Sequence, residues 1–241
     1  MKTRLFLLMV PLALLCGSCS ARINGALRRD GTGGLTLQAA LEPRMTALIR
    51  ALAALNPDAG SLPAEAPLID GAAISRSLSA APGVAAAALV NTGPAAIAGP
   101  VTVSRVDELL ALSGTQGTRF IAYEQGPDGG LLTITIDRAS GPSLLALISP
   151  DVKDYLSALL APVSTGEALS RAEYLGLVAG IYGRAIAEEI AAARIHLSIE
   201  FPGPVRSARG GSFTGSRAQF EVPLTDLLVL ESPLVYEVRW R

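Results

Sequence analysis

Three polar residues, His196, Ser198 and Glu200, stand at alternate positions of one predicted strand and have the residue types of a hydrolase triad. Side chains alternate along a strand, so these three share a face and Ile195 and Leu197 point to the other. Residues two apart on a strand are separated by about 6.6 Å, too far for the direct hydrogen bonds of a triad. Triads also recruit their members from different elements. We therefore expect a solvated polar face, with hydrolysis through His196 as the third functional alternative.

Some patterns in this chain resemble sites that bind phosphate, nucleic acid or metal in other proteins, but the further residues that such sites need are missing. The glycine-rich segment 30–34 has no Lys-Ser/Thr after it and no strand-loop-helix context, so it predicts a hairpin turn. A single Arg-Gly-Gly at 209–211 also predicts a turn. With one histidine and no cysteine in the body, and carboxylates without ligand spacing, we expect no metal, no cofactor and no catalytic residue. The carboxylates considered are Asp137, Asp151, Asp154, Glu188 and Glu189.

The two cysteines of the chain, Cys16 and Cys19, follow a short apolar run near its start. Lys2 and Arg4 precede this run, which covers residues 5–15. Its length is typical of the hydrophobic region of a signal peptide and too short for a membrane-spanning helix. The sequence therefore predicts an export signal followed by a body without cysteine.

The segment Leu15-Cys16-Gly17-Ser18-Cys19 resembles the lipobox of bacterial lipoproteins, in which a cysteine thiol receives diacylglycerol. Small residues directly precede Cys19, whereas leucines precede Cys16, so the resemblance makes Cys19 the lipidated residue. Cys16 replaces the usual aliphatic residue, as in the relaxed lipoboxes of spirochaetes. The resemblance implies a signal peptide at 1–18 and a body at 19–241, anchored outside the cytoplasm to an envelope membrane by fatty acids such as palmitate. The alternative is an ordinary secretory signal cut near Ala21.

Composition favours one packed domain that does not bind nucleic acid. Half of the residues are hydrophobic and 17% are charged, which supports a core and argues against disorder. The net charge is −1 without a basic cluster, so a nucleic-acid partner is not expected. The uncharged segments 77–104 and 174–183 are too broken or too short to span a membrane. We expect a single α+β domain, with a split into subdomains near 139–150 as the alternative.

Hairpins account for most of the predicted strands. Residues 21–28 and 35–41 flank one glycine-bearing turn, and residues 118–124 and 131–138 flank another. A helix from Pro43 to about Leu55 follows the first hairpin, and a short helix at 144–148 follows the second. Further strands are predicted at 84–90, 95–103, 194–201, 205–208, 217–222 and 234–240.

One long helix dominates the predicted second half. Ser164 and Glu167 have the spacing of a capping box that would open a helix over 167–193. Its middle is apolar on every side, so we expect it to be the central buried helix. Hairpins without a regular βαβ order predict an α+β fold, in which a mostly antiparallel sheet carries helices on one face. Shorter helices are predicted at 68–78, 105–112 and 150–160.

The order of these parts resembles envelope lipoproteins of the LppM type, including Phe201-Pro202-Gly203-Pro204-Val205 and the final Tyr236-x-Val-x-Trp240 strand. The resemblance implies an envelope-anchored protein with a fold suited to lipid binding and no catalysis, and no site residue transfers from it. We expect a non-enzymatic lipoprotein that binds an envelope protein or has a structural role. The alternative is a carrier that holds a lipid or glycolipid in an apolar cavity between sheet and helices.

Overall fold

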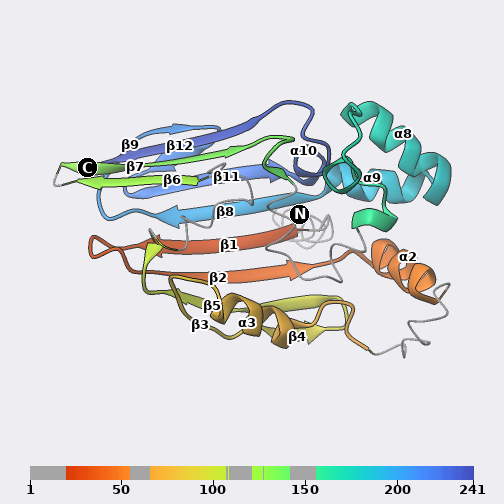
Figure 1. Cartoon of the computed structure of the whole chain (residues 1–241), viewed down its shortest axis with the longest axis horizontal. Coiled ribbons are helices and arrows are strands. Elements are labelled where there is room, and N and C mark those ends of the chain that lie inside the picture. The colour runs from red at the N-terminus through yellow and green to blue at the C-terminus, as the bar shows by residue number, and fades with distance from the viewer. Residues whose placement is uncertain (1–19, 55–65, 107, 109–120, 127, 142–155) are drawn as a thin grey trace, which may run out of the picture.

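The computed structural model describes residues 20–54, 66–106, 108, 121–126, 128–141 and 156–241 (Figure 1). Cys16 and Cys19 lie outside these ranges, as do Asp151, Asp154 and the helix predicted at 144–148. The boundary predicted near 139–150 also falls largely outside them, so it stays a prediction. Within the described ranges the chain has an α+β fold with two sheets, whose strands lie beside a group of helices (Figure 1).

The larger sheet, sheet A, is mixed. Its spatial order is β10 (Ser212–Thr214), β11 (Arg217–Pro223), β8 (Arg194–Glu200), β1 (Ser20–Leu27), β2 (Gly33–Ala40), β5 (Ala96–Val103) and β3 (Val84–Ala87), with β4 (Val90–Gly93) also paired to β5. The hairpin predicted from the turn at 30–34 is confirmed as β1 and β2, which pair antiparallel. However, β1 also pairs parallel with β8, with Ser20 opposite Arg194. Antiparallel pairing is thus the main but not the sole arrangement.

A second sheet, sheet B, covers part of sheet A. It contains β6 (Ile121–Gly126), β7 (Gly129–Ile136), β12 (Leu234–Trp240) and β9 (Val205–Arg209), in that order and antiparallel throughout. The second predicted hairpin is confirmed as β6 and β7. Apolar side chains from both sheets form a shared core, so the prediction of one sheet covered by helices alone is wrong. The buried members are Leu132, Phe201, Val205, Ala218, Phe220, Val238 and Trp240.

The helices fall into two groups. Helix α3 (Gly71–Ser79) packs on the other half of sheet A, where Ile74 and Leu78 meet side chains of β2 and β5. The others gather at one end of the sheets, in a group that we call the helical end (Figure 1). It comprises α2 (Pro43–Ala54), α7 (Pro162–Thr165), α8 (Arg171–Tyr182), α9 (Arg184–Ala192) and α10 (Leu224–Val229).

The prediction of one long central helix over 167–193 is wrong. The chain breaks at Gly183, whose φ of 93° and ψ of 152° are not helical, and α8 and α9 are separate helices on either side. The capping box also lies elsewhere: the Ser170 side chain accepts from the Glu173 N–H, and the Glu173 carboxylate accepts from the Ser170 N–H at 2.8 Å. Glycine adopts positive φ without steric cost, so an apolar run that contains it does not secure a continuous helix.

Candidate functional site

The polar face predicted around His196 is present on sheet A. Register places Arg22, His196 and Glu221 side by side on β1, β8 and β11. The His196 side chain is 42% exposed, and its Nδ1 lies 3.9 Å from the Glu221 carboxylate, beyond hydrogen-bond length. In the parts of the chain that the structure covers, no hydrogen bond joins His196 to Ser198. The face therefore lacks the geometry of a triad there, although it forms a shallow polar hollow of about 590 Å³.

The carboxylates considered as metal ligands have other partners. Asp137 accepts hydrogen bonds from the Ser140 N–H and hydroxyl, which hold the pKa of its carboxyl below the usual value. Glu188 pairs with Arg184 on α9 at 2.9 Å. Across the residues that the structure places, no cluster of three His, Cys, Asp or Glu residues is arranged to hold a metal ion. The helices among them are also too short or too polar to cross a membrane.

An apolar cavity of about 210 Å³ lies within the helical end. The end of β2, the helices α2, α9 and α10, and residues 156–159 contribute its walls. All of the lining side chains are apolar except that of Glu189, and they are Leu41, Met45, Ile49, Ile69, Leu156, Leu159, Glu189, Ile190, Ala193, Leu224 and Leu228. An engineered apolar cavity of about 150 Å³ stays dry and binds benzene, so this one has room for a larger apolar group.

Short amphipathic helices explain why the cavity forms here. Met45 and Ile49 are four residues apart on α2, as are Leu224 and Leu228 on α10, so each pair lies on one face of its helix. Both faces point into the helical core, together with Ile190 of α9. The sequence predicts the inward face of α2, but it gives no measure of how fully the facing side chains fill the space between the helices.

The polar atoms of Glu189 are engaged with α2. Its Oε2 accepts from the Met45 N–H at 3.1 Å, and its Oε1 lies 3.8 Å from Nε of Arg44. A carboxylate beside the first turn of a helix is stabilised by the free N–H groups there. The pKa of Glu42 is raised by burial and, secondarily, by the charge of Glu189. Two carboxylates and one guanidinium thus lie on the α2 side of the cavity, which disfavours an additional anion.

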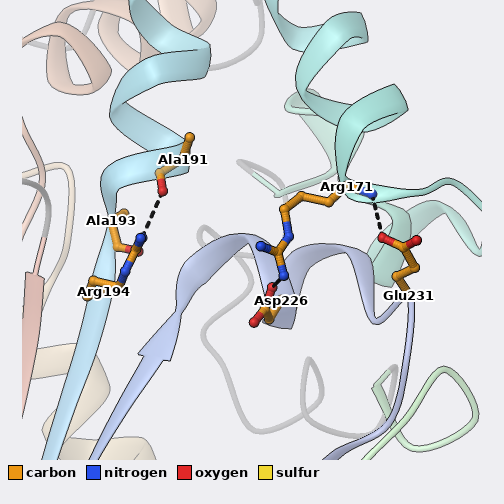
Figure 2. Close-up of polar contacts among 6 residues, drawn as sticks. All are labelled: Arg171, Ala191, Ala193, Arg194, Asp226 and Glu231. Carbon is orange, nitrogen blue, oxygen red and sulfur yellow. Dashed lines mark hydrogen bonds and ion pairs between the residues drawn. The ribbon is translucent and has the colours of Figure 1, made fainter.

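Hydrogen bonds from two arginines hold the helices that frame the cavity (Figure 2). Arg194, the first residue of β8, donates to the carbonyls of Ala191 and Ala193 at 2.7 and 2.9 Å and so caps the end of α9. At the start of α8, the Arg171 N–H donates to Glu231 at 3.0 Å, and its guanidinium bonds to Asp226 on α10. These contacts join the end of α9 to the start of β8, and the start of α8 to α10 and Glu231.

Tyr174 is the polar exception in the helical core. Its side chain is fully buried, and its hydroxyl has no hydrogen-bond partner among the residues that the structure describes. Burial, followed by the neighbouring Tyr182, raises its pKa to about 12. The hydroxyl therefore stays protonated and carries an uncompensated desolvation cost of about 1–3 kcal/mol.

Tyr174→Phe is expected to leave the free energy of unfolding unchanged or to raise it by about 1 kcal/mol, because it removes a buried hydroxyl that bonds to nothing. Urea unfolding of both proteins measures the difference. Tyr182→Phe is the matched control: its hydroxyl donates to the Ala158 carbonyl, and its loss is expected to cost about 1 kcal/mol. If Tyr174→Phe lowers the free energy of unfolding by more than about 1 kcal/mol, the Tyr174 hydroxyl has a hydrogen-bond partner.

Comparison with known proteins gives one structural similarity. No family model matches the chain, and no curated protein matches it. The solved NMR structure of the folded domain of LppM from Mycobacterium tuberculosis is similar with a TM-score of 0.42 and 13% identity, over 93% of this chain and 90% of that chain. Residues 15–19, which carry the predicted lipobox, lie outside the residues that the structure describes.

Proposed function

We propose that this chain is a lipid-anchored lipoprotein of the cell envelope, held outside the cytoplasm by acyl chains on Cys19, whose body binds an apolar ligand without catalysis. The observation that carries the proposal is the cavity of about 210 Å³ in the helical end. Lipid carriage requires an apolar cavity between sheet and helices, and this cavity lies between the end of β2 and three helices. It therefore supports binding of a lipid over a purely structural role.

A hydrocarbon chain is the ligand class that fits these walls. Each methylene buried in an apolar site contributes about 0.8 kcal/mol, and a polar head group would find no partner inside. The carboxylates Glu42 and Glu189 beside α2 also disfavour an anionic head at that wall. The ligand is accordingly an acyl or similar apolar chain whose head group remains outside the cavity.

Filling the cavity is expected to abolish binding of an apolar dye. The test uses the full-length Cys19→Ala chain, which carries no lipid of its own, and the same chain with Leu228→Trp, titrated with N-phenyl-1-naphthylamine. The added indole occupies the cavity, so the affinity for the dye should fall by about tenfold or more, equivalent to about 1.4 kcal/mol. Fluorescence enhancement measures the affinity.

Val90→Trp in the same background is the control. It adds an equal ring to β4 at a position that is 60% exposed and does not line the cavity, so dye binding should not change. All three proteins contain the same segment 1–18, so any dye that binds to this segment contributes equally to the three measurements. Equal affinity in the folded Leu228→Trp protein would contradict the proposal. If that variant does not fold, Ile69→Phe, at a partly buried wall position, replaces it.

A further inference from the structure

The first strand of the body begins beside the cavity. Ser20 pairs with Arg194 of β8, and Ala21 pairs with Ala39 of β2. Toward the helical end, Ala193 lies one residue beyond Arg194 and Leu41 lies two residues beyond Ala39. Both line the cavity. β1 starts at the helical end of sheet A (Figure 1), the end at which Ala193 and Leu41 line the cavity.

Covalent connectivity brings the lipidated residue of the proposed anchor to the same place. Cys19 directly precedes Ser20, and consecutive Cα atoms are about 3.8 Å apart. No linker separates the anchor residue from the first strand. A group tethered this closely has an effective concentration at the cavity of about a millimolar or more, which no dilute free ligand matches.

We propose that one acyl chain carried by Cys19 inserts into this cavity of the same molecule, so that the ligand of the body is its own lipid. This inference rests on the anchor and the cavity of the proposed function. By register, the described start of β1 at Ser20 and Ala21 lies within two residues of Leu41 and Ala193, so the tether to the cavity is short.

Charge favours a tethered chain over a free lipid as the occupant. An acyl chain joined to Cys19 brings no charge of its own to the wall. A fatty acid or an anionic phospholipid would place its head group near Glu42 and Glu189, and the carboxylate of Glu189 would repel it. Compared with a free anionic lipid, the lipid on Cys19 therefore has a higher effective concentration at the cavity and meets less charge repulsion there.

Insertion would regulate the strength of membrane attachment. One fatty chain holds a protein to a bilayer reversibly, whereas two or more hold it firmly. Moving a chain from the bilayer to the cavity exchanges one apolar environment for another, so the two states lie close in free energy. A protein with one chain withdrawn remains attached by the others but detaches more readily.

Photocrosslinking tests the inference on the full chain. The protein is produced in a bacterium that lipidates exported proteins and is fed a diazirine-bearing fatty acid, then purified, irradiated, digested and analysed by mass spectrometry. Crosslinks from lipid on Cys19 to peptides that contain residues 41–49 or 224–228 of the same chain are expected. Leu228→Trp should reduce the yield of these crosslinks by about tenfold or more while leaving Cys19 labelled. Val90→Trp should leave both the crosslinks and the labelling of Cys19 unchanged.

Three results would overturn the inference, each with a different meaning. If Cys19 is labelled but its lipid crosslinks only to bilayer lipids or to a second chain, the anchor stands and intramolecular insertion fails. If diazirine phospholipid added in vesicles crosslinks to the wall peptides and the lipid on Cys19 does not, the cavity binds membrane lipid instead. If Cys19 carries no label, the inference fails together with the proposed anchor.

Discussion

Replacing Cys19 with alanine is expected to abolish incorporation of labelled palmitate into the protein. The lipobox resemblance makes the thiol of Cys19 the acceptor, because small residues precede Cys19 and leucines precede Cys16. Each methylene of an attached chain contributes about 0.8 kcal/mol to membrane binding, so several chains account for a firm anchor. Metabolic labelling followed by gel fluorography measures the incorporation.

Cys16→Ala is the matched control for this experiment, since it removes the same atoms three residues earlier. It is expected to retain full labelling, because the leucines before Cys16 do not suit cleavage. Labelling is a better readout than membrane fractionation, since an uncleaved leader also associates with membranes. Loss of label in Cys16→Ala and its persistence in Cys19→Ala would assign the anchor to Cys16.

Trp240→Ala is expected to lower the free energy of unfolding by about 3–5 kcal/mol, a large part of the 5–15 kcal/mol that stabilises a typical domain. The indole is 4% exposed and stands between Phe201 and Tyr123, with ring centroids 4.8 and 5.8 Å away. It lies over Gly130, where a Cβ would approach the ring to 2.2 Å. The strand opposite is thus shaped to receive this side chain, and truncation leaves a cavity between the sheets.

Urea unfolding monitored by circular dichroism measures this loss. Phe213→Ala provides the comparison, because that ring is 45% exposed on β10 and its removal is expected to change stability by less than about 0.5 kcal/mol. A loss below about 1 kcal/mol in Trp240→Ala would show that the two sheets are held together mainly by other contacts.

Local signals predicted most of the described strands. The turn between β1 and β2 combines glycines with flanking alternation, and in the structure residues of β2 alternate between half-buried and exposed along the whole strand. The final strand was predicted over 234–240, the bounds that β12 has. Both features depend on neighbours in sequence, which explains why periodicity and turn residues were sufficient.

Features that depend on distant segments were not predicted. The parallel pairing of Ser20 with Arg194 joins segments near opposite ends of the body, and nothing in either segment specifies it. The break at Gly183 was missed because the apolar composition on both sides favoured one helix. The polar face of His196 follows from alternation alone and was predicted correctly.

The cavity was beyond the reach of sequence patterns for a related reason. Met45 and Ile49 were identifiable as a buried helix face, but a void reflects the mutual placement of several helices and not the type of any one residue. In the sequence, Glu189 is a carboxylate without metal-ligand spacing. Its contact with α2 appears only once α9 and α2 are brought together.

The central place of β1 in sheet A also sets the order of events during biogenesis. β1 is the first strand of the body to emerge, yet one of its two neighbours, β8, is made late, and β11 must then pair with β8. Sheets built from such distant segments fold slowly. In the proposed export of this chain, sheet A would close only after nearly all of the chain has been translocated, so that modification of a cysteine next to β1 would act on an unfolded protein.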